Sequence, residues 1–432
     1  MLRKLLLPLL FAALPLTGDT TVALLHFSDY HSHALPFYTD EGERGGIARA
    51  VGYLRAQKRA GALVFSGGDT VNKGAPAWSD KYQCAEWRWL NGIVDAMALG
   101  NHDVDYGREA FEECRAKVRY PILSANTNGF RGTAVFDVRG VRIGVFAVAG
   151  ADFAKLVTVP GLTFGDPVAA AKEAVHTLRD ELHADAVVMI GHQEAEADYE
   201  LARAVPGIDV IFGTHSHLKR DLVQIPGTTT SFLSPSQYLT YISRVELTIA
   251  DGRVKSVRGG LIPVDDSMPA DPRIARRVAK MQRELERDPR YRDLFTVIGR
   301  LDAPLSTEAL GHRTVEIMRE VAEADVALST KSSFRQPLPA GPLTMETLRA
   351  AMPYDNEIVS CTMSGAQLQR VLDAAGPESY TTALDAIDPS RTYRVATTDY
   401  VAQVAYKDLF ACEVTRSGSR AREETRGRIA ER

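Results

Sequence analysis

Val22-Ala-Leu-Leu-His-Phe27 is a short apolar run that leads directly into Ser28-Asp29-Tyr30-His31. Four further runs have the same form, and each is followed within a few residues by side chains that can bind a metal: Ala62-Leu-Val-Phe65, Ala96-Met-Ala-Leu99, Ala186-Val-Val-Met-Ile190 and Val210-Ile-Phe212. Runs of this length, bounded by glycine or serine, predict buried strands. Because side chains at strand ends can converge on one crevice, the pattern predicts an α/β domain with a site at that edge.

The side chains that follow the five runs form a set of oxygen and nitrogen ligands: Asp29, His31, Asp69, Asn101, His192, His215 and His217. Carboxylate, amide and imidazole groups suit divalent cations, and they do not distinguish Mn²⁺, Zn²⁺, Fe²⁺ and Co²⁺. We therefore predict a metal-dependent hydrolase with two divalent metal ions. The remaining isolated histidines are assigned structural roles, and of these only His33 could reach the site: His26, His33, His176, His183 and His312.

The bulk properties limit the partners of the chain. Its 432 residues allow two or three domains, and 45% hydrophobic with 25% charged residues is ordinary for a globular protein. A formal net charge of −4 gives no electrostatic footprint for nucleic acid or for an anionic membrane. We expect a small-molecule substrate and no nucleic-acid partner, and the oligomeric state stays open.

The N-terminus predicts export. Arg3 and Lys4 precede an apolar run, Leu5 to Leu16, that is too short to span a bilayer but suits the core of a signal peptide. The exit at 16–18 lacks a clean small-x-small pattern, so a buried first strand or helix is the alternative. We expect residues 1–18 to be a signal peptide, the protein to be periplasmic or extracellular, and no stable membrane insertion.

Four cysteines fit an oxidising compartment: Cys84, Cys114, Cys361 and Cys412. Two lie in each half of the chain, so we expect one disulfide per half. Four cysteines permit three connectivities, and buried free thiols also stay open. The CxxC spacing of a structural zinc site is absent.

The chain divides into five expected segments. After the signal peptide, residues 22–262 alternate apolar runs with helical stretches at 46–59 and 168–182, which predicts an α/β domain. Residues 263–296 contain a linker helix, opened by Asp271 as N-cap with Pro272 at the first helical position. Residues 297–415 predict a mixed α/β domain with helices at 314–324, 344–352 and 367–375 and strands at 325–328 and 357–363. The charged stretch 416–432 is expected to be a frayed or loosely attached helix.

Two motifs resemble those of the calcineurin-like metallophosphoesterases. They are Gly100-Asn-His-Asp103 and Gly213-Thr-His-Ser-His217, placed after Asp29-Tyr-His31 and Gly68-Asp69. Val104-Asp-Tyr-Gly107 and Gly45-Gly-Ile-Ala-Arg49 narrow the resemblance to the 5'-nucleotidase family, which includes periplasmic UDP-sugar hydrolases. The resemblance implies an N-terminal αββα metallophosphatase sandwich, a linker helix and a C-terminal mixed α/β substrate domain of the 5'-nucleotidase type.

The resemblance also implies roles for the ligand set. Asp29, His31 and His217 would hold one metal, Asn101, His192 and His215 the other, and Asp69 would bridge the two. Cations about 3.5–4 Å apart can clamp the attacking and leaving oxygens of an in-line displacement, with a bridging water as nucleophile. His102 would donate a hydrogen bond to the phosphate or leaving oxygen, and Asp105 would orient it and favour its protonated form.

Substrate recognition is expected in the second domain. Ser332-Ser-Phe-Arg335 and Met352-Pro-Tyr354 resemble the family pattern, in which an arginine contacts phosphate and an aromatic ring stacks on the nucleobase. Arg335 and Tyr354 occupy those positions. The family's glycine-rich base loop is replaced by Gln403-Val-Ala-Tyr-Lys-Asp-Leu-Phe410, where Phe410 or Tyr406 would supply a second ring.

Three functions remain open from the sequence. The first is hydrolysis of nucleoside 5'-monophosphates by a secreted phosphoesterase, with nucleotide diphosphate linkages as a further substrate class. The second keeps the metal pair but changes the substrate, as in a cyclic-nucleotide or general phosphodiesterase or a thiosulfohydrolase-like relative. The third is a non-catalytic protein that binds nucleotides or metals, against which the intact ligand set argues.

Overall fold

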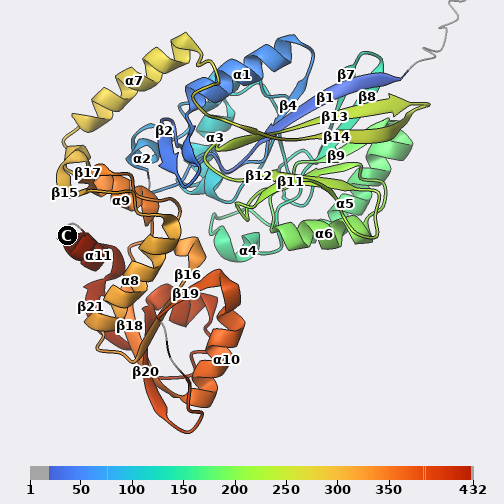
Figure 1. The fold of residues 1–432 in the computed structure, drawn as a ribbon. Coiled ribbons are helices and arrows are strands. Elements are labelled where there is room, and N and C mark those ends of the chain that lie inside the picture. The colour runs from blue at the N-terminus through green and yellow to red at the C-terminus, as the bar shows by residue number, and fades with distance from the viewer. Residues whose placement is uncertain (1–18, 75, 383, 385, 430–432) are drawn as a thin grey trace, which may run out of the picture.

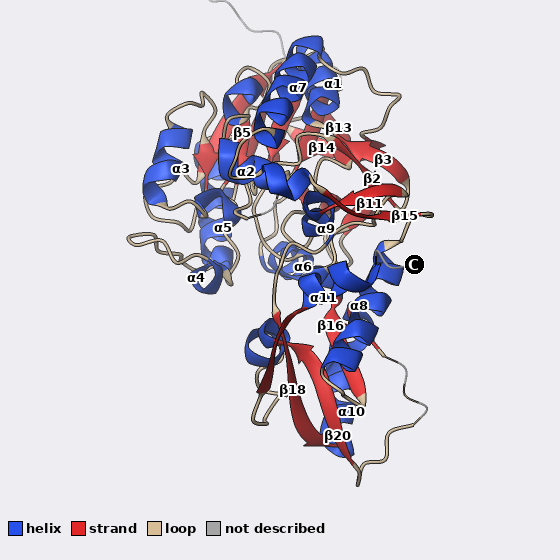
Figure 2. Ribbon diagram, turned by 90° about the vertical axis from the view of Figure 1, so that its left-hand side faces the viewer, coloured by secondary structure: helices blue, strands red, loops and turns tan. Residues whose placement is uncertain are grey.

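The computed structural model describes residues 19–429 except 75, 383 and 385, so the expected signal peptide lies outside the described residues. Two six-stranded sheets stack face to face in the N-terminal part, and a five-stranded sheet forms the core of the C-terminal part (Figure 1). Figure 2 shows helices on the outer sides of the stacked sheets. The predicted αββα sandwich with a C-terminal mixed α/β domain is confirmed.

The first sheet has the order β14-β13-β1-β4-β5-β6. Its strands are β1 (Thr20–Phe27), β4 (Leu63–Ser66), β5 (Ala96–Ala98), β6 (Ile122–Leu123), β13 (Tyr241–Ala250) and β14 (Arg253–Pro263). The second sheet has the order β11-β12-β10-β9-β8-β7. Its strands are β7 (Thr133–Val138), β8 (Val141–Phe146), β9 (Ala186–Met189), β10 (Val210–Phe212), β11 (Lys219–Gln224) and β12 (Ser231–Pro235). A hairpin of β2 (Pro36–Thr39) and β3 (Gly42–Gly45) lies outside both sheets.

Alternation along each central strand separates the apolar layers. On β1, Leu24 belongs to the core between the sheets, whereas Leu25 belongs to the core beneath the outer helices. Such strands carry continuous apolar runs because both of their faces are buried. The N-terminal helices are α1 (Ile47–Arg59), α2 (Ala77–Tyr82), α3 (Arg108–Arg115), α4 (Phe153–Leu156), α5 (Pro167–His176) and α6 (Ala195–Ala204).

The linker helix α7 (Pro272–Glu286) begins where the sequence predicts it. The Asp271 side chain accepts hydrogen bonds from the backbone N–H groups of Arg273 and Ile274, which satisfies two donors of the first turn. Its apolar residues join the core of the first sheet and its helices. The helix is also tied to α2, because Lys81 Nζ donates to the Glu284 carbonyl at 2.8 Å and the Tyr82 hydroxyl donates to the Met281 carbonyl at 2.5 Å.

The C-terminal sheet has the order β19-β16-β20-β18-β21. Its strands are β16 (Val326–Thr330), β18 (Glu357–Ser364), β19 (Ser379–Thr381), β20 (Thr392–Thr398) and β21 (Thr415–Arg420), beside a separate pair of β15 (Val297–Leu301) and β17 (Gly341–Thr344). Helices α8 (Thr307–Val321), α9 (Met345–Ala351) and α11 (Ala421–Ile429) contribute to one core, and α10 (Gly365–Ala375) to the core on the other side.

The described part of the charged tail contains a helix, as expected, but the expected fraying or loose attachment is wrong. Residues 415–420 pair with β18 as the edge strand β21, and α11 packs against α8. Ala421, Thr425 and Ile429 are buried although the stretch is rich in charge. Burial of these few residues against the domain is enough to order the segment, while most of its charged side chains stay in solvent.

Both disulfides follow the expectation of one per half. Cys84 is bonded to Cys114, and Cys361 to Cys412. Within the described residues, no helix combines the length and apolar character that crossing a bilayer requires.

Candidate active site

The ligand-type side chains meet where parallel strands of the two sheets end. Strands β1, β4 and β5 are parallel neighbours, as are β9 and β10, so the loops after them emerge at one edge. Five of these residues adopt left-handed backbone with φ between 46° and 56°: Asp29, His31, Asp69, His215 and His217. This conformation is unfavourable for residues with a side chain, and such strain clusters at functional sites.

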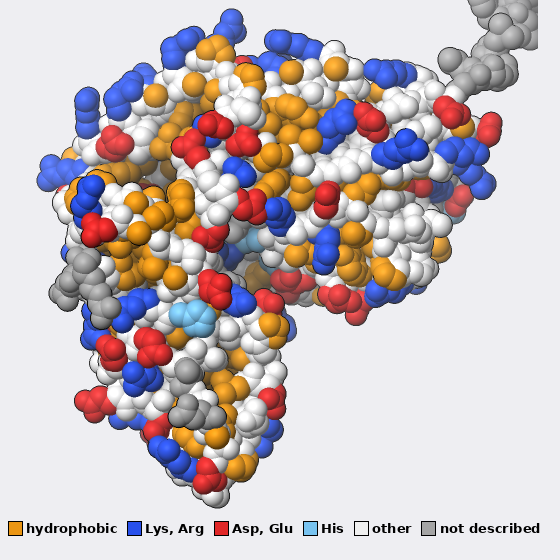
Figure 3. All heavy atoms as spheres, in the orientation of Figure 1, with side chains coloured by type: hydrophobic (Ala, Val, Ile, Leu, Met, Phe, Trp, Pro, Cys, Tyr) orange, Lys and Arg blue, Asp and Glu red, His pale blue; other side chains and the backbone are white. Residues whose placement is uncertain are grey.

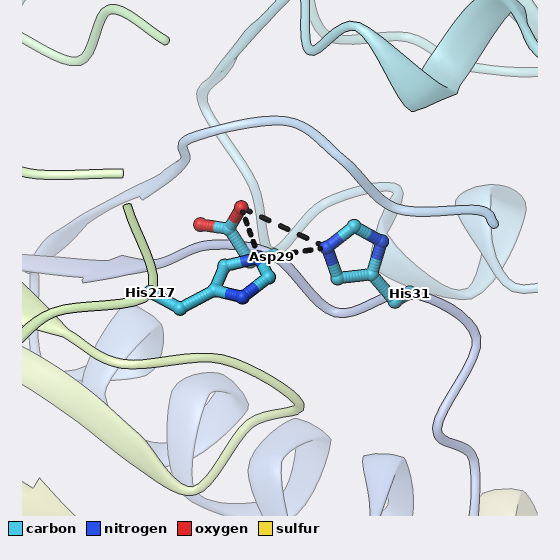
Figure 4. Close-up of side chains that lie close together, drawn as sticks. All are labelled: Asp29, His31 and His217. Atoms are coloured by element: carbon cyan, nitrogen blue, oxygen red, sulfur yellow. Dashed lines mark hydrogen bonds and ion pairs between the residues drawn. The ribbon is translucent and has the colours of Figure 1, made fainter. Parts of the chain in front are cut away.

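A first group consists of Asp29, His31 and His217 (Figure 4). Asp29 Oδ1 lies 3.8 Å from His31 Nε2 and 3.4 Å from His217 Nε2, and the two imidazole nitrogens are 3.2 Å apart. Asp29 Oδ1 is buried and has no hydrogen-bond partner within the described residues. Three electron-pair donors facing one another in this way suit a cation.

A second group consists of Asp69, His192 and His215. Asp69 Oδ2 is 3.2 Å from His192 Nε2 and 3.8 Å from His31 Nε2, so one carboxylate faces both groups. Burial alone would lower the pKa of His192, but the charges of Asp69 and Asp29 raise it to about 10. Asn101 Oδ1 is buried without a partner among the described residues. The unpaired Asn101 oxygen and the negative charges of Asp29 and Asp69 suit the binding of divalent cations.

Backbone carbonyls orient two of the imidazoles. His192 Nδ1 lies 2.7 Å from the Gly67 carbonyl and His31 Nδ1 lies 3.3 Å from the Val71 carbonyl. A carbonyl accepts only from an N–H, so these contacts leave Nε2 of each neutral ring with a free lone pair. His33 lies beside the site, but its ring stacks on Tyr238 at 3.6 Å.

Asp103 fixes the loops that carry Asp69 and Asn101. Its carboxylate accepts hydrogen bonds from the backbone N–H groups of Asp69 (3.1 Å), Thr70 (2.8 Å) and Gly100 (2.9 Å), and from the Thr70 hydroxyl at 2.6 Å. A Cβ at Gly100 would lie 2.2 Å from Asp69 Oδ1, so only glycine permits this approach. The sequence reasoning assigned Asp103 no role.

His102 and Asp105 form the predicted pair. His102 Nδ1 lies 2.8 Å from Asp105 Oδ2, and the His102 backbone N–H donates to Asp69 Oδ1 at 2.8 Å. Burial would lower the pKa of His102, but Asp69 and Asp105 together raise it to about 9. The protein's own side chains therefore favour a protonated imidazole at neutral pH, able to donate through Nε2.

A buried acid lies behind the first ligand loop. Glu86 is 2% exposed and accepts hydrogen bonds from the Tyr30 hydroxyl at 3.1 Å and from the Trp78 indole. Burial raises the pKa of Glu86 from 4.5 to about 7. Between these values the folded state binds more protons than the unfolded state, so the free energy of unfolding falls as pH rises through this window.

Glu86→Gln is expected to remove this pH dependence. Relative to the variant, the wild-type protein should lose on the order of 3 kcal/mol of unfolding free energy between about pH 5 and pH 8. Urea titrations of both proteins at the two pH values measure the difference. The exposed control Glu173→Gln should keep the wild-type slope, and equal slopes for wild type and Glu86→Gln would contradict the prediction.

Arg335 and Tyr354 reach the site from the C-terminal part. Arg335 Nη1 contacts His217 Nδ1, and Nη2 donates to the Tyr354 hydroxyl at 3.0 Å. Tyr354 is 43% exposed. Figure 3 shows charged and histidine side chains recessed in the hollow where the upper and lower parts of the molecule meet.

The expectation for Phe410 is wrong. Its ring is 5% exposed and belongs to the core around α10, so neither face is free for a base. Tyr400 follows β20 and is 45% exposed, and after burial the Tyr354 hydroxyl is the next cause that raises its pKa. An aromatic residue two positions after a strand was the signal in the sequence that could have identified Tyr400.

The C-terminal helix supports the loop that carries Tyr354. Arg422 of α11 is buried, and its guanidinium donates to the carbonyls of Met352 and Pro353 at 3.0 Å each. A second guanidinium nitrogen lies 3.4 Å from Asp355 Oδ2. Arg422, in the stretch expected to be loosely attached, thus contacts residues on both sides of Tyr354.

Residues 22–219 match the calcineurin-like phosphoesterase family, and residues 297–384 match the C-terminal domain of 5'-nucleotidases. The chain belongs to the 5'-nucleotidase family of metallophosphoesterases and is a hydrolase. The protein UshA of Yersinia enterocolitica is 26% identical over 473 residues, which covers 88% of this chain and 85% of UshA. The family assignment agrees with the resemblance seen in the sequence motifs.

Two solved structures share the fold over almost the whole chain. The 5'-nucleotidase precursor from Thermus thermophilus has a TM-score of 0.74 at 21% identity, covering 95% of this chain and 96% of its own. The sulfate thiohydrolase SoxB from the same organism also has a TM-score of 0.74 at 21% identity, covering 96% and 95%. The fold alone therefore does not select the substrate.

Proposed function

We propose that this protein is a secreted two-metal phosphoesterase that hydrolyses nucleoside 5'-monophosphates. The observation that carries the proposal is the arrangement around Asp69. Its carboxylate faces two groups of ligand-type side chains, and Arg335 and Tyr354 approach the same place from the C-terminal part. A phosphate between these elements would meet positive charge on both sides.

The proposed ligand assignment follows the two groups. Asp29, His31 and His217 would hold one divalent cation, Asn101, His192 and His215 the second, and Asp69 would bridge them. Two such cations supply Lewis-acid stabilisation and a nucleophilic water for in-line displacement at phosphorus. The ligand atoms do not choose among manganese, zinc, iron and cobalt.

The remaining polar side chains would act on the substrate directly. His102 Nε2 would donate a hydrogen bond to a phosphate or leaving-group oxygen, while Asp105 keeps the ring oriented and protonated. Arg335 would exchange its contact with His217 for phosphate oxygens, which a guanidinium binds in a fork. Each of these groups stabilises negative charge that develops on the phosphoryl oxygens.

Two half-exposed tyrosines favour a nucleotide over a simple phosphate ester. The Tyr354 hydroxyl accepts from Arg335, and Tyr400 is a second half-exposed ring of the C-terminal part. Stacking of a base on an aromatic ring contributes about 1–3 kcal/mol. The glycine-rich loop of the family is absent, and residues 401–405 form a π-helical turn instead. Selectivity would therefore depend on stacking more than on hydrogen bonds to base edges.

Tyr354→Ala and Tyr400→Ala are each expected to raise KM for AMP by about 5- to 150-fold, because each removes one stacking surface. Turnover of p-nitrophenyl phosphate, which has no nucleobase, should change much less. Steady-state kinetics on both substrates measure the difference. Tyr400→Phe, which keeps the ring, is the matched control, and equal loss on the two substrates would contradict a base-stacking role.

Export is supported by the sequence and by the disulfides. Both cysteine pairs are bonded in the structure, which suits an oxidising compartment. The apolar run before residue 18 has the length of a signal-peptide core. We infer a periplasmic or extracellular location.

A substrate panel on chelator-treated protein with added Mn²⁺ tests the proposal. AMP should be hydrolysed with the highest kcat/KM, followed by UDP-glucose. Preference for 2',3'-cyclic AMP or bis-p-nitrophenyl phosphate would make the protein a phosphodiesterase. Activity confined to a thiosulfate ester would place it with the thiohydrolase neighbour, and bound Mn²⁺ without any turnover would indicate a binding protein.

A further inference from the structure

One carboxylate outside the predicted set contacts a ligand-type histidine. Asp152 Oδ2 lies 3.1 Å from His215 Nε2. Asp152 follows β8, in the segment that leads into α4. The side chain of His215 is 13% exposed and that of Asp152 is 37% exposed, so the pair lies at the inner wall of the site.

The Asp152 carboxylate is not used to begin a helix. Asp152 precedes α4, but its side chain makes no capping hydrogen bond there, whereas its backbone carbonyl accepts from Lys155 and Leu156. The next residue, Phe153, is fully buried, with its ring centroid 5.8 Å from His192 and 6.4 Å from His215. The segment is thus built against the two histidines of the second group.

The contact determines which nitrogen of His215 is free. A carboxylate accepts a hydrogen bond from Nε2–H, and a neutral imidazole protonated at Nε2 has its lone pair on Nδ1. His31 and His192 show the opposite arrangement, because backbone carbonyls hold their Nδ1 atoms. Of the three, His215 alone is held by a carboxylate outside the proposed ligand set.

We propose that Asp152 is a positioning residue that presents His215 through Nδ1 to the second metal of the pair. The inference rests on the proposed function for the identity of that metal site. It assigns to Asp152 the role that an outer-shell carboxylate has for a metal-binding histidine, whose loss typically lowers metal affinity about 10- to 100-fold. The affinity of the first site should not depend on it.

Glu194 is the competing partner. Its Oε1 lies 3.6 Å from His215 Nε2, and its side chain is 59% exposed. Asp152, Glu194 and His215 also satisfy the spacing of a separate cation site. In that arrangement Asp152 would itself be a ligand, and the protein would bind a third cation.

Calorimetric titration of the chelator-treated full chain with Mn²⁺ tests the proposal. Wild type should bind two equivalents. Asp152→Ala should weaken the second equivalent by about 10- to 100-fold and leave the first within about twofold. Asp152→Asn keeps a hydrogen-bond acceptor but loses the charge, so its affinity for the second equivalent should lie between those of wild type and Asp152→Ala. Asp152→Glu should restore part of that affinity. Glu196→Gln, an exposed carboxylate on α6 that pairs with Arg203, is the matched control.

Thermal unfolding separates positioning from folding. In the presence of chelator, Asp152→Ala should have the same melting temperature as the wild type. When Mn²⁺ is added, the melting temperature of the variant should rise less than that of the wild type. Unchanged affinity at both sites, three equivalents in wild type, or an equal loss in Glu194→Gln would overturn the proposal. Two bound equivalents without turnover of any phosphoester would refute the proposed function and leave the inference on Asp152 intact.

Discussion

Asp69→Asn is expected to lower kcat/KM for AMP by about 10³-fold or more. The asparagine keeps an oxygen that can accept the backbone N–H of His102, so the loop should hold its shape. The substitution removes the negative charge of residue 69, which faces His31 of the first group and His192 of the second group. Loss of one cation's stabilisation of the transition state removes several kcal/mol, and about 4 kcal/mol corresponds to about 10³-fold in rate.

Mn²⁺ stoichiometry measured beside the kinetics identifies the cause. We expect Asp69→Asn to bind fewer than two equivalents, with an unchanged thermal transition in chelator. Asp137→Asn changes an exposed carboxylate on β7 and should match the wild type in both measurements. Two tightly bound equivalents with turnover close to that of wild type would contradict a bridging role.

His102→Ala is expected to lower kcat for AMP by about 10²-fold or more while both Mn²⁺ equivalents remain bound. The reason is that removing one preorganised donor to a developing oxyanion costs about 10²- to 10³-fold in turnover. The His102 ring is held by Asp105 and is not among the proposed ligands. Kinetics and metal analysis of the same preparation test both halves of the prediction.

His176→Ala provides a matched control. His176 Nδ1 lies 2.6 Å from Asp180 Oδ2, a histidine–aspartate pair of similar geometry on an exposed helix. Its removal should leave kcat unchanged. If His102→Ala retained wild-type turnover, His102 would have no part in the reaction, and if it lost a metal equivalent, His102 would be a ligand.

Local chemistry made much of this fold predictable. The apolar runs became strands because both faces of β1, β4, β5, β9 and β10 are buried, so nearly every residue of each run must be apolar. The linker helix begins at Asp271 and Pro272 because capping and a fixed proline φ act within one turn. The ligand set converges because parallel strands share one carboxyl edge.

Other features depended on packing that no local pattern contains. Helix α8 begins at Thr307, well before the predicted start at Thr314, where Ser306 caps it, and it continues through Gly311, which lies against the Tyr380 ring where a Cβ would come within 2.3 Å. Glycine there permits close packing and does not interrupt the helix. The charged C-terminal segment likewise makes contacts that no local pattern contains, since Arg422 donates to carbonyls of the Tyr354 loop.

The sequence by itself determined an α/β domain, the linker helix and the seven ligand-type side chains, because spacing along strands and at helix ends sets these features, whereas the sandwich was implied by the resemblance to the 5'-nucleotidase family. The tertiary structure decided which partner holds each imidazole, which aromatic ring is free and which is buried, and where Arg335 lies. Asp152 shows the difference. It follows β8 as the ligand-type residues follow their strands, yet its contact with His215 exists only because a segment 63 residues away folds beside it.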